Sequence, residues 1–322
     1  MLEIELRTLG RSTVDVPRIA LGCGSFGGIG TELALFGAGL DEAESFAVMD
    51  AAWRLGITHF DTADAYGGGR SEELIGQWAR SRGVRPLLTT KTYHQMNVGA
   101  EHGLAPIRVK RQLESSLARL QVDHVDLYLA HAYDPDVSLA ETLSAFERLA
   151  VEGVVRAYGV SNFDAHQLEC ALAAGSPQAV QNSYSLLDRR DEDDVKPICA
   201  EHSLAYLAFS PLSGGWLTGK YRRGETFPTG SRMTHLPEVY RRLVDEPTFT
   251  ALDRLTAIAR DRNMSMAGLA LGWLLADERV TQLIVGPRRP AHLEPIREAL
   301  SNPLSATERD ELGAVFTRTG HR

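Results

Sequence analysis

Short runs of apolar and β-branched residues alternate with longer amphipathic stretches along the whole chain. The short runs predict strands, because they are bounded by polar or turn-forming residues. The predicted strands are Arg18–Gly22, Thr58–Thr62, Pro86–Thr92, Val125–His131, Arg156–Ser161, Ala179–Tyr184, Ala205–Pro211 and Gln282–Gly286. In the longer stretches apolar residues recur every three or four positions, which predicts helices. The predicted helices are Glu42–Leu55, Ser71–Arg80, Ile107–Leu120, Leu139–Val151, Ala165–Ala173, Asp193–Glu201 and Thr248–Asn263.

Strands that alternate with helices are typical of a parallel α/β sheet, and this number of strands favours closure into a (β/α)8 TIM barrel. The opening segments Glu3–Arg7 and Val14–Pro17 flank Gly10 and Arg11, and we expect them to form a β-hairpin that closes the barrel floor. The sequence contains no low-complexity linker, charge block or shift in composition. We therefore expect one domain over residues 1–322.

Two predicted loops are longer than ordinary connections between a strand and the next helix. One runs from Thr92 to Ala105, and the other from Leu212 to about Glu246. Both follow strands. Because the loops that follow the strands of such a barrel build its active site, we expect these two segments to act as lids or clamps over that end.

Composition and charge narrow the class of protein. The formal net charge is −8, and Lys and Arg residues form no stripe, which argues against nucleic acid or an anionic membrane surface as a partner. Cys23, Cys170 and Cys199 have neither paired nor metal-ligand spacing, as expected in a reducing compartment. The start of the chain does not resemble a signal peptide, and no apolar run is long enough to span a bilayer. We predict a cytoplasmic protein, a monomer or weak homo-oligomer, with a small-molecule substrate.

Polar residues gather where the predicted strands end. Asp61 ends the second barrel strand and Tyr66 follows it, while Lys91 and His131 end the third and fourth strands. Groups at the same end of consecutive strands converge on one mouth. A neighbouring ammonium lowers the pKa of a tyrosine, and a carboxylate holds that ammonium in place. The pattern predicts a tyrosine that exchanges a proton with a carbonyl oxygen, with His131 orienting that oxygen.

The later strands carry residues of a different kind. Ser161 and Asn162 end the fifth strand, Gln181 lies in the sixth, and Phe209 ends the seventh. Asn162 and Gln181 suit the two ends of a carboxamide, and Phe209 offers a flat face to an aromatic ring. No side chain supplies a hydride, so this chemistry needs a bound cofactor. The nicotinamide of a cofactor carries a carboxamide, has an aromatic ring and transfers a hydride, so it matches these residues.

The segments DTADAYGGGRSEELIG, GVSNF and FSPLSGGWLTGKY, with Lys91 and His131 at strand ends, together resemble the aldo-keto reductase superfamily over essentially the whole chain. The resemblance implies an NADP(H)-dependent enzyme that reduces an aldehyde or ketone to an alcohol, or catalyses the reverse, by direct hydride transfer. It implies a catalytic tetrad of Asp61, Tyr66, Lys91 and His131, with Tyr66 as general acid/base and no metal. The implied cofactor-binding residues are Gly24, Ser25, Phe26, Asp61, Ser161, Asn162, Gln181, Phe209, Ser210, Pro211, Leu212, Gly214, Lys220, Gly286, Arg288, Arg289 and Glu294.

One segment departs from the family pattern. Many relatives carry an acidic residue followed by Asn at the adenine end, and here those positions are Pro295 and Ile296, with Glu294 one place early. Arg288, with Arg289 beside it, is implied as the partner of the cofactor's 2′-phosphate, because guanidinium groups suit that dianion. The departure at Pro295 leaves NAD(H) open as an alternative cofactor.

Other interpretations of single motifs are weaker. Residues 22–27 match the GxGxxG dinucleotide fingerprint, but no helix follows directly to receive a pyrophosphate. His59 with Asp61 could indicate a metal site, although a structural role is favoured because there is no further His cluster. Lys91 alone would also fit a Schiff-base lysine. Trp216 and Tyr221 suit substrate contact and packing equally, and His94 and His102 are expected on the solvated surface.

A function from another class is a nucleotide-binding regulatory barrel with little turnover. The filled catalytic positions Asp61, Tyr66, Lys91 and His131 argue against it. Substrate identity and the physiological direction of the reaction do not follow from the sequence.

Overall fold

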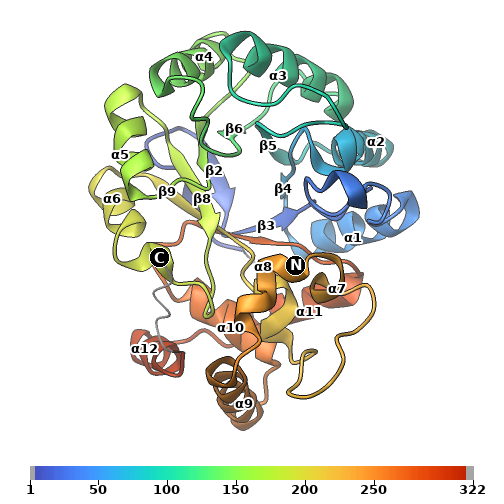
Figure 1. The fold of residues 1–322 in the computed structure, drawn as a ribbon, viewed down its shortest axis with the longest axis vertical. Helices are drawn as coiled ribbons and strands as arrows, with labels where there is room; N and C mark the ends of the chain where they lie inside the picture. Colours follow the sequence, from blue (N-terminus) through green and yellow to red (C-terminus); the bar gives the residue numbers. More distant parts are fainter. Residues whose placement is uncertain (1–3, 317–322) are drawn as a thin grey trace.

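The computed structural model describes residues 4–316, and its centre is a closed barrel of parallel strands in the order β10-β3-β4-β5-β6-β7-β8-β9. Figure 1 shows the strands inside a ring of helices. The predicted (β/α)8 barrel is therefore confirmed. The barrel strands are β3 (Ile19–Gly22), β4 (His59–Asp61), β5 (Leu87–Thr92), β6 (Leu127–Ala130), β7 (Tyr158–Ser161), β8 (Ala179–Ser183), β9 (Ala205–Phe209) and β10 (Gln282–Val285).

Each predicted strand is present, with one or two residues fewer at its ends. The strands are buried almost throughout, because helices cover their outer side and side chains fill the barrel interior. The helices around them are α1 (Glu42–Leu55), α2 (Arg70–Arg82), α3 (Pro106–Leu120), α4 (Leu139–Val151), α5 (Ala165–Ala174), α6 (Val195–Glu201), α9 (Glu246–Asp261), α10 (Met266–Leu275), α11 (Glu294–Ser301) and α12 (Ala306–Ala314).

Local sequence signals fix several helix ends. Asp41 and Glu44 form a capping box at the start of α1, and Gly56 ends that helix in the left-handed conformation. Asp164 and Gln167 form the same capping arrangement at α5. These signals explain why the predicted bounds of α1 are those of the structure.

The N-terminal hairpin consists of β1 (Leu6–Thr8) and β2 (Asp15–Pro17), paired antiparallel outside the barrel. Leu9, Val14 and Val16 pack in one apolar cluster with residues of the barrel interior, among them Leu127 and Leu207. The hairpin therefore closes the floor, as predicted. Glu3, at the start of the predicted segment, lies outside the described residues.

The two long loops both leave the C-terminal ends of strands. Residues 93–105 connect β5 to α3. The segment after β9 carries two helices that the sequence pattern did not reveal, α7 (Arg232–His235) and α8 (Pro237–Tyr240). In Figure 1 these two short helices are drawn next to each other, in the part of the view where α10 and α11 also appear.

Candidate functional site

The four residues predicted to carry the chemistry lie together at the C-terminal end of the barrel. Asp61 ends β4, Lys91 lies near the end of β5, and His131 directly follows β6. Lys91 Nζ donates hydrogen bonds to Asp61 Oδ1 at 2.6 Å and to the Thr62 carbonyl oxygen at 2.8 Å. Both members of this ion pair are buried. A buried ammonium is stable here because a carboxylate and a carbonyl replace its water.

Tyr66 lies across this ion pair at the barrel mouth. It opens a 3₁₀ turn, Tyr66–Gly69, in which Gly67 and Gly68 adopt positive φ angles of 58° and 67°. Lys91 Nζ is 5.1 Å from the centroid of the Tyr66 ring. The His131 ring is 5.5 Å from the same ring, centroid to centroid, in an edge-on arrangement. Tyr66 is only partly buried, so a ligand at the mouth can reach it.

The electrostatic outcome at Tyr66 differs from the sequence-based expectation. Burial raises the pKa of the phenol, and the lowering by Lys91, which has the expected sign, does not offset it. Burial also lowers the pKa of His131 well below its usual value, with Lys91 and His94 acting in the same direction. Burial opposes the charge of Lys91 as well, but Asp61 outweighs it and the net pKa of Lys91 is raised. At neutral pH the site therefore holds a protonated tyrosine, a neutral imidazole and an ammonium.

The three residues predicted to bind a carboxamide lie beside the ion pair. Gln181 Nε2 donates to Asp61 Oδ2 at 2.8 Å, and Ser161 Oγ donates to the Gln181 carbonyl oxygen at 2.8 Å. Asn162 Nδ2 donates to the His131 carbonyl oxygen at 2.9 Å. Asn162 has a φ of 61°, an uncommon value for a residue other than glycine. These three residues are thus connected by hydrogen bonds to Asp61 and His131, which belong to the group around Tyr66.

The segment after β9 has an irregular backbone. Ser210, Ser213 and Gly214 all have positive φ angles, of 53°, 46° and 63°. Turns of this kind point successive N–H groups into a concavity that suits an anion. The ring of Tyr240 from α8 covers this turn, since a Cβ on Gly214 would lie 2.4 Å from Tyr240 Cζ. Phe209 at the end of β9 is partly buried, Pro211 is buried, Leu212 is partly buried, and Lys220 Nζ lies 4.9 Å from the Tyr221 ring centroid.

The predicted residues around the end of β3 also reach the mouth. Gly24 packs against Tyr66, because a Cβ there would lie 3.5 Å from Tyr66 Cε2. Ser25 and Phe26 are buried, and Ser25 Oγ has no hydrogen-bond partner within residues 4–316. A short 3₁₀ helix at Leu33–Leu35 follows, and the next α-helix begins only at Glu42, so the GxGxxG match at residues 22–27 does not open a helix.

The structure brings together only some of the residues predicted to bind the adenosine part of the cofactor. Arg288 donates to the Gly230 carbonyl oxygen at 2.7 Å, which ties the segment after β10 to the loop after β9. Arg289 is exposed, and Glu294 forms an ion pair with Arg297 at 3.5 Å. Gly286 lies next to β3, where a Cβ would be 3.7 Å from the Gly22 carbonyl oxygen. Ile296 is buried in the core and cannot contact a ligand, whereas Pro295 occupies the first turn of α11, where proline is tolerated.

Sequence reasoning missed Arg232 in α7. Burial lowers the pKa of this guanidinium, while Tyr240 and Tyr66 favour its charged form. Among the described residues its guanidinium has no hydrogen-bond or ion-pair partner. Arg232 lies in a loop with no regular pattern, so only the folded loop reveals that it faces the mouth.

Three weaker interpretations are also resolved by contacts. His59 hydrogen-bonds Thr89 Oγ1 at 2.8 Å and Gln282 Nε2 at 2.9 Å, which supports the structural role. Trp216 is fully buried and packs against Tyr221, whose ring centroid is 5.0 Å away. The surface role expected for His94 is wrong, because its ring packs against His131 with centroids 4.8 Å apart.

No group of three or more His, Cys, Asp or Glu residues within 4–316 is arranged to hold a metal ion. None of the helices in the same range is long and apolar enough to cross a membrane.

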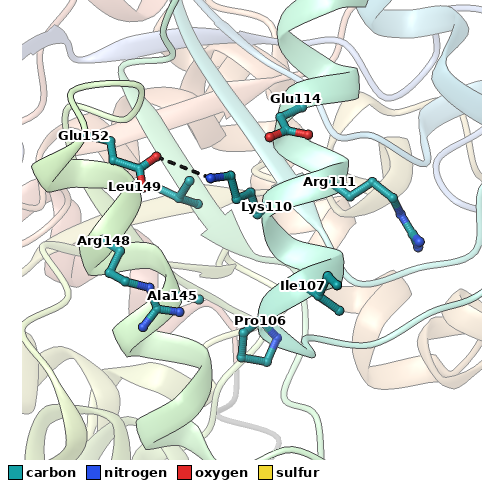
Figure 2. Close-up of a pocket in the computed structure, with 9 residues that line it drawn as sticks. All are labelled: Pro106, Ile107, Lys110, Arg111, Glu114, Ala145, Arg148, Leu149 and Glu152. Atoms are coloured by element: carbon teal, nitrogen blue, oxygen red, sulfur yellow. Dashed lines mark ion pairs between the residues drawn. The ribbon is translucent and has the colours of Figure 1, made fainter.

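A groove on the outer surface lies between α3 and α4 (Figure 2). Lys110 of α3 faces Glu152 of α4 there, with Nζ 3.9 Å from the carboxylate oxygen. The groove combines such exposed charged side chains with the apolar Ile107 and Leu149. It contains none of the residues that the sequence singled out.

Comparison with known proteins agrees with this arrangement. Residues 18–315 match the model of the aldo/keto reductase family. The chain is 31% identical to aldo-keto reductase YhdN of Bacillus subtilis over 320 residues, covering 98% of this chain and 95% of the relative. It is 31% identical to the aldo-keto reductase yakc [NADP(+)] of Schizosaccharomyces pombe over 312 residues, covering 94% and 89% of the two chains.

The fold is similar to that of the glycerol dehydrogenase AKR11B4 from Gluconobacter oxydans, with a TM-score of 0.83 and 25% identity over 97% of this chain and 95% of that one. The family match, the sequence relatives and the solved structure all span nearly the whole chain. The chain belongs to the aldo/keto reductase family of oxidoreductases.

Proposed function

We propose that this protein reduces an aldehyde or ketone to an alcohol with NADP(H), or catalyses the reverse reaction, and that Tyr66 is the general acid/base. The observation that carries the proposal is the position of Tyr66. Its partly exposed ring stands over the buried Lys91–Asp61 ion pair and beside His131. This combination supports proton exchange with a carbonyl oxygen at the mouth.

Each residue of the group has a separate task in this proposal. Tyr66 keeps its proton at neutral pH because its pKa is raised, so its O–H can donate to the carbonyl oxygen. The Lys91 ammonium, held by Asp61, stabilises the phenolate that remains after the proton leaves. Neutral His131 orients the same oxygen. In the oxidation direction the Tyr66 phenolate takes the proton from the alcohol.

The residues around the mouth fit a nicotinamide dinucleotide. When bound, that cofactor supplies or accepts the hydride. Ser161, Asn162 and Gln181 would hold its carboxamide, and Phe209 would stack on the ring. The buried hydroxyls of Ser25 and Ser231 have no hydrogen-bond partner within residues 4–316, so they are polar atoms that a ligand would satisfy.

A phosphate-rich ligand fits the cationic side of the mouth. The turn at Ser210–Gly214 and the guanidinium of Arg232 suit a pyrophosphate, and Lys220 lies in the same loop. Arg288 would bind the 2′-phosphate that distinguishes NADP(H) from NAD(H). The relative whose name includes NADP(+) supports this choice.

The test combines cofactor binding with turnover. Purified protein is titrated with NADPH and with NADH while tryptophan fluorescence is followed, and consumption of NADPH is measured with a panel of simple aldehydes and ketones. We expect NADPH to bind more tightly and to be consumed. Tyr66→Phe should bind NADPH as the wild type does but lose nearly all turnover.

A matched control is Tyr133→Phe, whose ring packs against Phe163 at 5.7 Å outside the Tyr66 group. This variant should keep full activity. If Tyr66→Phe still turned over its substrate, the role of Tyr66 as the general acid/base would be contradicted. Tight binding of NADPH without turnover of any carbonyl compound would instead favour a regulatory nucleotide-binding barrel.

A further inference from the structure

One buried arginine, Arg108, holds the loop of residues 93–105 in place. Arg108, in the first turn of α3, is 3% exposed. Its guanidinium donates to Thr92 Oγ1 at 2.9 Å, to the Gly103 carbonyl oxygen at 2.7 Å and to the His94 carbonyl oxygen at 2.9 Å. A single side chain thus connects the end of β5, one residue beyond Lys91, to both ends of the loop.

A second buried group closes the same loop. Asp134 Oδ2 accepts a hydrogen bond from the Leu104 N–H at 2.6 Å, and the Gly103 N–H donates to the Tyr93 carbonyl oxygen at 2.7 Å. Gly103 has a φ of 98°, and a Cβ at this position would lie 2.7 Å from the Asp134 carboxylate. This loop is longer than an ordinary connection, yet buried hydrogen bonds hold both of its ends.

The fixed loop places His94 at the mouth. Its ring packs against the rings of Tyr93 and His131, with centroid distances of 5.2 Å and 4.8 Å. The His131 ring also packs against Tyr66, with centroids 5.5 Å apart, so His131 links His94 to the group around Tyr66. Within residues 4–316 no side chain or backbone group hydrogen-bonds the ring nitrogens of His94. These nitrogens are therefore available to a ligand.

The ionisation of His94 decides what kind of ligand it suits. Burial lowers its pKa, and the nearby charges of Arg108 and His102 lower it further. A neutral imidazole carries one donor and one acceptor nitrogen, which matches a hydroxyl group better than an anion.

We infer that His94 is a specificity-determining residue that selects carbonyl substrates with a hydroxyl group on the carbon next to the carbonyl, and that Arg108 is the residue that positions it. The inference rests on the proposed function. A carbonyl oxygen held by Tyr66 and His131 leaves the neighbouring carbon free to extend toward His94, whose ring packs against His131. A hydroxyl there makes a hydrogen bond that an alkyl group of equal size cannot make, and a site built for such a bond discriminates against the alkyl analogue.

Two aldehydes of nearly equal size provide the test. Glycolaldehyde carries a hydroxyl where propionaldehyde carries a methyl group. Initial rates with saturating NADPH give kcat/KM for each aldehyde, and the ratio of the two values is the readout. We expect the wild type to prefer glycolaldehyde by roughly tenfold or more, as one hydrogen bond to a substrate hydroxyl provides. His94→Phe should bring the ratio close to one, and His94→Gln, which keeps hydrogen-bonding groups, should retain part of the preference.

Arg108→Met tests the positioning role, with Arg108→Lys as the conservative variant. Arg108→Met should lower the ratio through a higher KM for glycolaldehyde, and Arg108→Lys should restore part of it. Lys110→Met is the matched control on the same helix, because its side chain points outward to Glu152 (Figure 2). Thermal unfolding of each variant identifies any that fail to fold, and His94→Phe and His94→Gln still decide the question if Arg108→Met is one of them.

The outcomes separate the inference from the function on which it rests. Turnover of both aldehydes with the same ratio in the wild type and His94→Phe overturns the inference alone. A wild type that turns over propionaldehyde as efficiently as glycolaldehyde also overturns the inference alone. If the wild type turns over neither these aldehydes nor any other carbonyl compound, the proposed function fails and the inference fails with it.

Discussion

Lys91 Nζ lies 2.6 Å from Asp61 Oδ1, and neither side chain is more than 5% exposed. The second oxygen of Asp61 accepts a hydrogen bond from Gln181, so the carboxylate is fully engaged inside the barrel. A buried ion pair of this kind adds little net stability, but removal of one partner is expensive because the other charge is left in a medium that cannot solvate it.

Asp61→Leu should therefore destabilise the protein by about 3–5 kcal/mol, and Lys91→Met by a similar amount. The double variant should lie closer to the wild type than the sum of the two single costs, since it leaves no unpaired charge. Urea unfolding of the four proteins measures the coupling. Additive costs would mean that the two side chains contribute independently, contrary to their contact.

The barrel and the group around Tyr66 could be predicted because both depend on patterns that are local in the sequence. Eight apolar runs and the helices between them predict the closed sheet. In such a barrel every strand end faces the same mouth, so the positions of Asp61, Lys91 and His131 at strand ends were sufficient to bring them together.

Other features of the site depend on contacts between distant segments. Arg232 and Tyr240 lie in a loop without regular periodicity, and only folding brings Tyr240 onto Gly214. His94 seemed a surface residue in the sequence because nothing there indicates that Arg108 fixes its loop. The net rise in the pKa of Tyr66 depends on the degree of burial, which residue types alone do not give.

Asp64 should make the protein less stable as the pH rises toward neutrality. Its carboxyl is fully buried with Oδ1 unpartnered in the described chain, while Thr92 Oγ1 donates to Oδ2 at 2.7 Å. Burial raises the pKa of Asp64 from 3.8 to about 7; Glu72 adds to the rise, whereas Thr92, Arg108 and Arg119 oppose it. Between about pH 4 and pH 7 the folded state therefore binds more protons than the unfolded state, and the free energy of unfolding falls as pH rises through this window.

At about 1.4 kcal/mol per pH unit, this carboxyl lowers the stability above pH 7 by roughly 4 kcal/mol. Asp64→Asn cannot ionise and should remove this part of the pH dependence, so that the variant gains relative to the wild type as the pH is raised. Urea unfolding at intervals from pH 4 to pH 8 gives both curves. Parallel curves for the two proteins would show that Asp64 has the same pKa folded and unfolded.

Arg288→Ala should reduce the preference for NADPH over NADH. In this structure the Arg288 guanidinium donates to the Gly230 carbonyl oxygen and lies between the segments after β9 and β10. Loss of a charge-assisted hydrogen bond costs about 1.5–3 kcal/mol, so NADPH should bind roughly tenfold to a hundredfold more weakly while NADH binding is little changed. Fluorescence titration with both nucleotides measures this. Arg289, which is exposed, is the control. A larger effect of Arg289→Ala would show that Arg289, and not Arg288, binds the 2′-phosphate.

Gly10→Ala should loosen the barrel floor without touching the mouth. Gly10 has a φ of 55°, and a Cβ there would lie 2.2 Å from the Gln178 carbonyl oxygen and 3.1 Å from that of Ser203, just before β8 and β9. Backbone strain at positive φ costs about 1 kcal/mol, and the clash must add to it because both neighbours are backbone atoms.

Gly83→Ala provides the matched control, with a φ of 64° and nothing within 4 Å of the added Cβ. Thermal and urea unfolding should therefore show a clearly larger loss for Gly10→Ala than for Gly83→Ala, with NADPH affinity unchanged in both. Equal losses would mean that the hairpin can move away from the barrel at no cost, and that Leu9, Val14 and Val16 do not hold it against the floor.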